Sequence, residues 1–144
     1  MRISIVSFQK QRRTDLDTPE QEYIKRLSRW VQVELSPVRN FDDASGIPER
    51  FLKGQHLIGL FVDGKRLSSE ALAARVQGLM NRGNSHLVLV IGAAEGMPRS
   101  AAEQVHERWS LSPLTFSHQL SRLVLLEALY RAYDILSGGR RYHK

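Results

Sequence analysis

Hydrophobic and polar positions alternate along the chain in a way that predicts strands separated by helices. Residues 2–8, 31–35, 56–62 and 86–91 are predicted strands, and 109–111 is a shorter fifth strand that ends before a proline. The run at 86–91 is apolar without alternation, which is typical of a central parallel strand covered on both faces. Strands and helices that follow one another in this order favour an α/β fold with a mostly parallel sheet flanked by helices.

Helices are predicted between these strands from their start and stop residues. Thr18 is expected to cap the first helix, with Pro19 as its first helical residue. A turn at 63–65 ends the third strand, and Ser68 or Ser69 is expected to cap the helix that follows it. A short helix is predicted after the fourth strand.

The longest predicted helix runs from His118 to about Leu136. This segment contains no glycine or proline, Ser117 stands at its N-cap position, and Gly138-Gly139 is expected to end it. Its apolar residues occupy almost every face, and a helix of that kind is buried on two sides. We therefore expect a second subunit to cover one side, with Leu126 in the seam, so that the protein is a homodimer.

Composition narrows the class of protein. The chain has 144 residues, a usual length for one domain, so residues 1–144 are predicted to form a single domain. Its net charge of +6 and pI near 10.1 favour an anionic partner such as nucleic acid. The lack of cysteine excludes disulfides and thiolate metal sites. No apolar run is long enough to span a membrane and no signal-peptide layout is present, so we expect a cytoplasmic protein without membrane contact.

Ligand-binding positions are expected where the parallel strands end, because small molecules bind beyond the carboxyl ends of strands in α/β sheets. Three segments qualify: 60–63, 92–96 and 111–116. Gly92 and Gly96 would let the backbone approach a ligand closely, and the last segment offers backbone groups and hydroxyls to the edges of a purine ring. The chain has no G-x-G-x-x-G motif and no P-loop lysine, which weighs against a dinucleotide or a nucleoside triphosphate.

Several segments carry motifs whose order and spacing resemble one protein family. The last third reads Trp-Ser-Leu-Ser-x-Leu-Thr-Phe-x-His-Gln-Leu from Trp109, then Arg122, then Leu-Glu-x-Leu-Tyr-Arg-Ala from Leu126, and a final Tyr-His-Lys. Upstream, Ile-Gly-x-x-x-Gly from Ile91 and Gly-Lys-x-Leu-Ser-Ser-Glu from Gly64 also match. The chain therefore resembles the RlmH family, SPOUT-class methyltransferases that act on pseudouridine in large-subunit ribosomal RNA.

The resemblance implies both a fold and a reaction. The fold would be a SPOUT-type α/β knot, with a C-terminal trefoil knot in which the last helix is threaded through a loop. The reaction would be methyl transfer from S-adenosyl-L-methionine to N3 of a pseudouridine in 23S ribosomal RNA, on the ribosome. Matched residue by residue, the cofactor-binding residues would be Leu60, Gly92, Leu111, Ser112, Pro113, Leu114, Thr115 and Phe116.

Residues for substrate contact follow from the resemblance and from side-chain chemistry together. Tyr142, His143 and Lys144 form an aromatic and cationic tail that is expected to contact the RNA. His143 is the predicted base or carbonyl polariser, because histidine titrates near neutrality. Arg122 is expected either to contact the substrate or to pair with Glu127 or a helix end.

The remaining histidines give no indication of a metal site. His118 stands at a helix start, where a structural hydrogen bond is expected rather than catalysis. His56, His86 and His106 are scattered without metal-ligand spacing, so no metal is predicted.

Four positions depart from the family pattern. Ala93 stands where the family usually has a second glycine, and Ser117 stands where it usually has a proline. Phe61 stands where an acidic residue is common, and Gln9 stands where a glycine is usual. These departures leave two alternatives open. The chain could be a catalytically inactive, knotted RNA-binding protein that acts in ribosome assembly, or a methyltransferase for another RNA such as tRNA.

Overall fold

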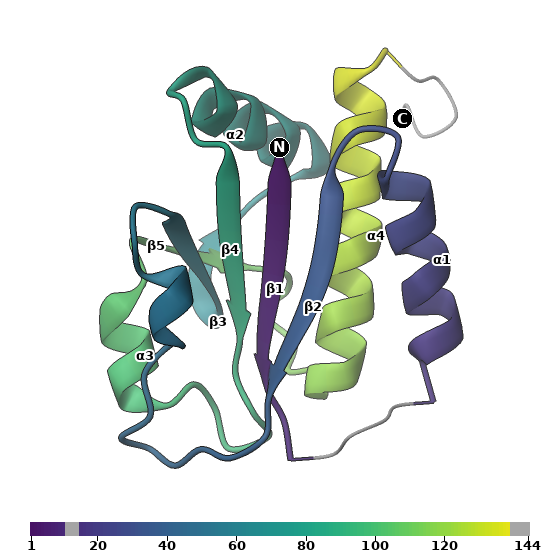
Figure 1. Cartoon of the computed structure of the whole chain (residues 1–144). Helices are drawn as coiled ribbons and strands as arrows, with labels where there is room; N and C mark the ends of the chain where they lie inside the picture. The colour runs from purple at the N-terminus through teal and green to yellow at the C-terminus, as the bar shows by residue number, and fades with distance from the viewer. Residues whose placement is uncertain (11–14, 139–144) are drawn as a thin grey trace.

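A five-stranded sheet forms the centre of the protein (Figure 1), as seen in a computed structural model that describes residues 1–10 and 15–138. The strand order is β2-β1-β4-β3-β5, and each pair of neighbouring strands is parallel. The elements in chain order are β1 (Arg2–Phe8), α1 (Asp17–Leu27), β2 (Gln32–Val38), the 3-10 helix η1 (Glu49–Phe51), β3 (His56–Arg66), α2 (Ser69–Asn81), β4 (His86–Ile91), α3 (Arg99–Gln104), β5 (Glu107–Ser110) and α4 (His118–Leu136).

The most apolar predicted strand, β4, lies in the middle of the sheet as expected. All of its residues after His86 are buried, because helices cover both faces of the sheet. β1 pairs with β4 on one side and with β2 on the other, so that Ile5 lies between Leu89 and Leu35. β2 is an edge strand, which suits Pro37 because proline has no N–H to donate to a further strand.

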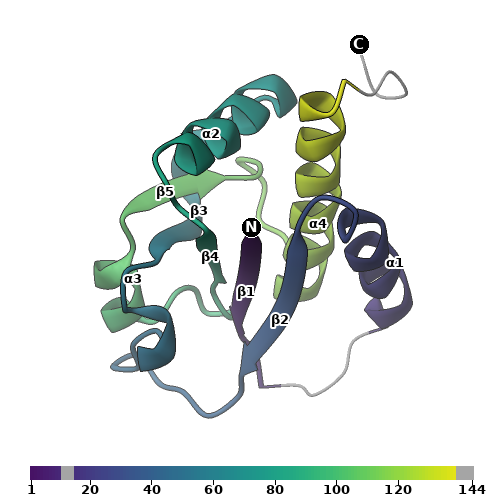
Figure 2. The same cartoon turned by 45° about the horizontal axis from the view of Figure 1, so that its top comes forward.

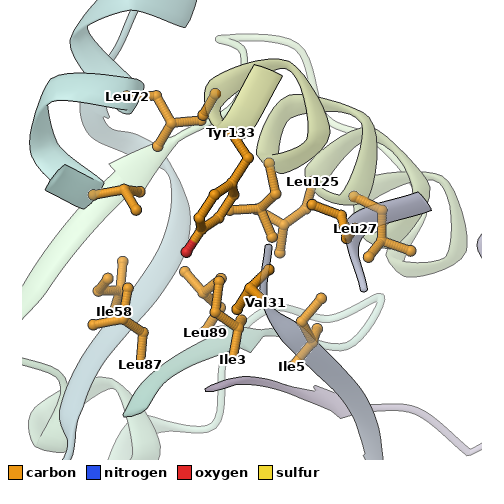
Figure 3. Packing of buried hydrophobic residues seen from close by; sticks show 14 of the residues in the cluster. Ile3, Ile5, Leu27, Val31, Ile58, Leu72, Leu87, Leu89, Leu125 and Tyr133 are labelled. Atoms are coloured by element: carbon orange, nitrogen blue, oxygen red, sulfur yellow. The ribbon is translucent and has the colours of Figure 1, made fainter. Parts of the chain in front are cut away.

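Helices α1, α4 and α2 cover one face of the sheet, with α4 between the other two (Figures 1 and 2). They bury the larger apolar cluster against the sheet (Figure 3), to which α4 contributes Leu125, Leu126 and Leu129, all fully buried. The burial of α4 on two sides is thus achieved within one chain, by the sheet and the two neighbouring helices. The prediction that Leu126 lies in a subunit seam is wrong, because this side chain belongs to the core of a single subunit.

The opposite face of the sheet carries a second, smaller apolar cluster. η1 supplies Phe51 and α3 supplies Ala101, and both pack against Val88 and Val90 of β4. The sheet is therefore the middle layer of three. Because the strands are parallel, their carboxyl ends lie at the same end of the sheet, at the bottom of Figure 1 near the first turn of α4.

Two of the three predicted N-caps, Ser68 and Ser117, are confirmed and one is wrong. The Ser68 hydroxyl accepts a hydrogen bond from the Ala71 N–H, so Ser68 is the N-cap of α2. The first helix begins at Asp17 after Leu16, with no side-chain cap, so the predicted capping role of Thr18 is wrong. Asp17 and Glu20 lie in the first turn of this helix, where their negative charges interact favourably with the positive end of the helix dipole. This interaction offsets part of the cost of the missing cap.

The third and fifth strands also differ from their predicted bounds. β3 does not turn at residues 63–65 but continues to Arg66, and Leu60 and Lys65 both pair with Trp109 across a register shift. Gly64 permits this pairing, because a Cβ there would lie 2.7 Å from backbone atoms of Trp109. β5 begins earlier than expected and spans Glu107–Ser110 rather than 109–111.

The parallel sheet with flanking helices is the α/β fold that the resemblance implies. Strand order and register do not by themselves establish a threaded helix, so the trefoil knot stays a prediction, as does the single-domain organisation of residues 1–144. In the part of the chain that the structure describes, no helix has the length and apolar character needed to cross a membrane.

Candidate functional site

A cavity of about 270 Å³ lies beside β3, at the carboxyl end of β4 and next to the first turn of α4. The three segments predicted to form a ligand site meet around it. Seven of the eight predicted cofactor-binding residues line its wall: Leu60, Gly92, Leu111, Ser112, Leu114, Thr115 and Phe116. Pro113 lies in the same loop but is exposed and outside the lining, so its role stays a prediction.

The loop after β4 is closed by its own backbone. Ala93 and Gly96 exchange two hydrogen bonds, with N···O distances of 3.0 and 2.9 Å, and Gly96 has a φ of +114° that favours glycine. A Cβ at Gly92 would lie 2.7 Å from the Met97 nitrogen. The sequence predicted that Gly92 leaves room for a ligand, but here the missing side chain leaves room for the returning loop.

The loop after β5 is held by short-range hydroxyl contacts. The Ser110 hydroxyl lies 3.0 Å from the carbonyl oxygens of both Val62 and Ser112, and the Leu114 N–H donates to the Ser112 hydroxyl at 2.9 Å. These contacts tie the loop to β3, while the Leu114 side chain stays 70% exposed. The loop therefore presents a fixed backbone to the cavity, with an apolar side chain at its rim.

Several residues that were not named individually as cofactor-binding also line the cavity. Phe61 is one, and its ring lies under the Arg108 guanidinium, whose carbon is 4.1 Å from the ring centroid. Gly59 makes this position possible, because a Cβ there would lie 2.4 Å from the Phe61 ring. Glu95 and Ser121 are two others. The sequence signal was available for Phe61 and Glu95, which lie within two of the predicted segments, whereas Ser121 lies one turn along α4 from its N-cap.

His118 differs from its predicted role. It is the first residue of α4 and lines the cavity, but its Nε2 atom is buried and has no hydrogen-bond partner within residues 1–10 and 15–138. Burial lowers the pKa of His118, the nearby Arg122 charge lowers it further, and the Glu20 carboxylate opposes both. The imidazole is therefore neutral at pH 7, and the structural hydrogen bond predicted for His118 is not found at its Nε2 atom.

Arg122 lies behind His118 and is 4% exposed. Its guanidinium donates to both oxygens of Glu20, at 2.6 and 3.0 Å, and also to the Ser7 hydroxyl and the Gln9 side-chain oxygen. The alternative that Arg122 pairs with Glu127 is wrong, because Glu127 binds Arg131 and Tyr23. Contact between Arg122 and a large RNA would first require this buried ion pair to open, so the geometry does not support that prediction.

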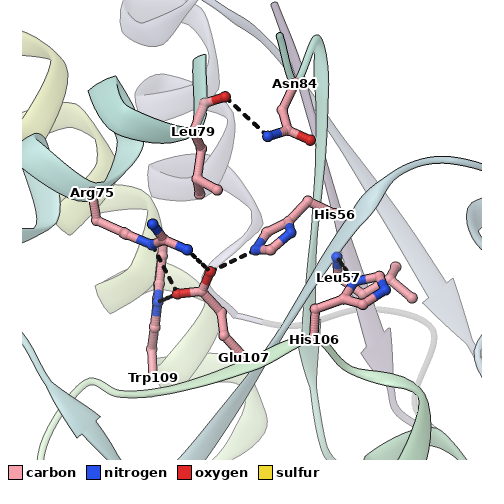
Figure 4. Close-up of polar contacts among 8 residues, drawn as sticks. All are labelled: His56, Leu57, Arg75, Leu79, Asn84, His106, Glu107 and Trp109. Atoms are coloured by element: carbon pink, nitrogen blue, oxygen red, sulfur yellow. Dashed lines mark hydrogen bonds and ion pairs between the residues drawn. The ribbon is translucent and has the colours of Figure 1, made fainter. Parts of the chain in front are cut away.

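A second polar network lies at β3 and β5, the two strands at one edge of the sheet (Figure 4). The Glu107 carboxylate accepts hydrogen bonds from Arg75, at 2.7 and 3.1 Å, and from the Trp109 indole at 2.7 Å, and it contacts His56 at 2.5 Å. Burial alone would raise the pKa of Glu107, but these donors outweigh it and hold the pKa at about 2. The network fixes β5, and so the start of the loop that lines the cavity.

The histidines are less scattered than the sequence suggested. The rings of His56 and His106 stack with centroids 5.3 Å apart, and the His106 Nδ1 accepts the Leu57 N–H at 2.9 Å. His86 bonds instead to the Ser4 hydroxyl on β1. Across residues 1–10 and 15–138, no group of three or more histidine or acidic side chains is arranged to hold a metal ion.

The predicted substrate-contacting tail, Tyr142, His143 and Lys144, lies outside the described residues. The structure therefore describes only the cofactor-binding part of the predicted site, and the roles of these three residues stay predictions.

Comparison with known proteins agrees with the fold. The profile of the family described as "Predicted SPOUT methyltransferase" matches residues 1–143. The chain belongs to the RlmH family of SPOUT methyltransferases. It is 37% identical to a protein of Sorangium cellulosum named ribosomal RNA large subunit methyltransferase H, over 99% of this chain and 100% of that protein. A protein of the same name from Acetivibrio thermocellus is 35% identical over the full length of both chains.

Proposed function

We propose that this protein is an S-adenosylmethionine-dependent methyltransferase that modifies N3 of a pseudouridine in 23S ribosomal RNA, on the ribosome. The observation that carries the proposal is the meeting of three distant segments, around Leu60, Gly92 and residues 111–116, in one cavity of a chain from this family. The names of its full-length relatives support ribosomal RNA of the large subunit as the substrate. The net charge of +6 suits an RNA partner.

The lining of the cavity fits S-adenosylmethionine. Leu60, Leu111 and Phe116 offer apolar walls for an adenine ring, and the two loops offer backbone donors and acceptors for its edges. The Glu95 carboxylate at the cavity would favour a positively charged sulfonium. When bound, the cofactor supplies an activated methyl group, so the protein has chiefly to position the acceptor nitrogen and remove its proton.

The C-terminal tail is proposed to act on the RNA side of the reaction. His143 would accept the proton from N3 or polarise a neighbouring carbonyl, Tyr142 would stack on the base, and Lys144 would contact phosphate or carbonyl oxygens. Arg122 is buried and would act structurally instead. Its ion pair with Glu20 holds α4 against α1 and so fixes the start of α4 beside the cavity.

A homodimer remains part of the proposal, on a different face of α4 from the one expected. Leu120, Leu123 and Val124 lie in the first two turns, in neither apolar cluster, and Leu120 is 40% exposed. They adjoin the cavity residues His118 and Ser121. Because the proposed substrate is the ribosome, the protein would work in the cytoplasm.

The proposal is tested with purified protein, methyl-labelled S-adenosylmethionine and large ribosomal subunits from cells that lack the modification. Label should appear in 23S ribosomal RNA, and mass spectrometry of nuclease fragments should place it on N3 of one pseudouridine. Label in tRNA alone would favour the second alternative, a methyltransferase for another RNA. Cofactor binding without transfer to any RNA would favour an inactive RNA-binding protein.

A further inference from the structure

The most unusual group at the cavity is the imidazole of His118. It lines the cavity, yet its Nε2 atom is buried and lacks a hydrogen-bond partner among the described residues. Leaving a buried polar atom unpaired costs free energy, because the atom gives up its bond to water and gains none in return. A group of this kind at the wall of a cavity is explained if the cavity's occupant supplies the missing partner.

The backbone of His118 is held in place beside the cavity. His118 is the first residue of α4, and the Ser117 hydroxyl caps that helix by accepting the Leu120 N–H at 3.2 Å. The Ser121 N–H bonds to the Ser117 carbonyl at 2.8 Å. Behind the ring, Arg122 is held by Glu20 of α1 and by β1 residues. The helix start therefore fixes the backbone of His118 beside the cavity, and a turn of its side chain would bring the buried Nε2 atom to an occupant.

The surroundings of the His118 ring keep the imidazole uncharged, so that it can form a hydrogen bond as a neutral group. Burial and the Arg122 guanidinium both lower the pKa of His118, so the ring is uncharged at pH 7. A neutral imidazole offers one N–H and one lone pair, and it does not place a positive charge beside a cationic sulfonium.

We infer that His118 binds the methyl donor directly, through a hydrogen bond from its Nε2 atom to a polar group of S-adenosylmethionine. This inference rests on the proposed function, because it takes the cavity to be the cofactor site. It makes His118 a ligand-contacting residue, whereas the sequence had assigned it a structural role.

A hydrogen bond to the ligand and a structural hydrogen bond predict opposite results for removal of the ring nitrogens. His118→Phe keeps an aromatic ring and removes both nitrogens, so the ligand-free protein should be as stable as the wild type or more stable. His118→Gln keeps a polar amide near the position of Nε2. His86→Phe is the matched control, because His86 Nε2 bonds the Ser4 hydroxyl at 2.8 Å, far along the sheet from the cavity.

Calorimetry with S-adenosylmethionine and with S-adenosylhomocysteine, without RNA, would measure the affinities, and thermal denaturation would measure the stability of each ligand-free protein. His118→Phe should lose about tenfold or more in affinity for the methyl donor at unchanged or higher melting temperature. His118→Gln should keep affinity within roughly threefold. His86→Phe should show the reverse, a lower melting temperature with unchanged affinity.

A direct readout avoids substitution altogether. In protein labelled with ¹⁵N at histidine, saturation with S-adenosylmethionine should shift the Nε2 resonance of His118 and leave that of His86 in place. Wild-type affinity in His118→Phe, or an unmoved His118 resonance, would overturn this inference while the cofactor site stands. A wild-type protein that binds no methyl donor would overturn the proposed function and this inference together.

Discussion

Arg122 and Glu20 form a buried ion pair in which two guanidinium nitrogens reach the two carboxylate oxygens, at 2.6 and 3.0 Å. The residues are 4% and 1% exposed, and they join α4 to α1 behind the cavity. Ser7 and Gln9 at the end of β1 complete the hydrogen bonding of the guanidinium. One pair therefore connects two helices and the sheet at the wall where His118 sits.

Removal of one partner from this pair should be strongly destabilising. Arg122→Ala leaves the Glu20 carboxylate buried without its counter-charge, and we expect a loss of about 3–5 kcal/mol in the free energy of unfolding. Arg26→Ala is the control, because Arg26 pairs with Glu22 at 3.6 Å on an exposed surface, where such pairs contribute less than about 1 kcal/mol. Urea denaturation measures both, and similar small losses would show that the buried pair contributes little.

Glu107 should make stability depend on acidic pH. Its folded pKa of about 2 lies below its ordinary value of 4.5, so its contribution is complete above pH 4.5 and is lost as the pH falls from 4.5 towards 2. The free energy of unfolding of the wild type should therefore exceed that of Glu107→Gln by up to about 3 kcal/mol near pH 7, and the two values should converge near pH 2–3. Denaturation curves across this range would test it; a constant difference at all pH values would contradict it.

Tyr133 should respond at the other end of the pH scale. Figure 3 shows its hydroxyl pointing into the apolar cluster, where it has no partner among the described residues, and burial raises its pKa to about 12. Tyr133→Phe should raise the free energy of unfolding by about 1 kcal/mol near pH 7. The advantage should grow as the pH rises from 10 towards 12, since wild type then loses the contribution of the neutral phenol. A destabilised phenylalanine variant would reveal a hidden partner.

Gly92 should be essential to the cavity, because a Cβ there would press on the Met97 nitrogen at 2.7 Å. Gly92→Ala is expected to displace the loop and to weaken binding of S-adenosylmethionine on the order of 10–100-fold by calorimetry. Ala93→Gly restores the residue usual in the family at a neighbouring position and should bind nearly as the wild type does. Equal affinity in Gly92→Ala would mean that the loop adapts without cost to the cofactor.

The dimer proposal can be separated from a folding defect by two leucines of α4. Leu120→Glu changes an exposed side chain and should give a folded monomer in sedimentation velocity, with an unchanged circular dichroism spectrum. Leu126→Glu buries a charge in the core and should cost about 3 kcal/mol or more in stability. A wild-type protein that sediments as a monomer would remove the need for an apolar contact at Leu120.

Features set by local sequence could be predicted well. The central place of β4 follows from an apolar run without alternation, and the ends of α4 follow from a serine cap and glycine. The three cavity segments could be named because parallel strands bring their carboxyl ends together. Such signals lie within a few residues of the feature that they determine.

Features set by contacts between distant residues could not be predicted. Glu20 lies 102 positions before Arg122, so no spacing rule relates them, and the nearer Glu127 was the natural but wrong partner. The unpaired Nε2 of His118 likewise depends on how α4 meets the loops, which no local pattern encodes. Leu126 was assigned to a seam because the sequence could not reveal that α1 and α2 cover the same helix.

The place of β4 between β1 and β3 has a consequence for biosynthesis. β1 is made before β2 and can pair with it as soon as β2 emerges, but its other edge waits until residues 86–91 emerge. An unpaired apolar edge of this kind invites association with other chains. The ligand cavity also needs the first turn of α4, so a nascent chain acquires it only after residues 118–121 have been made.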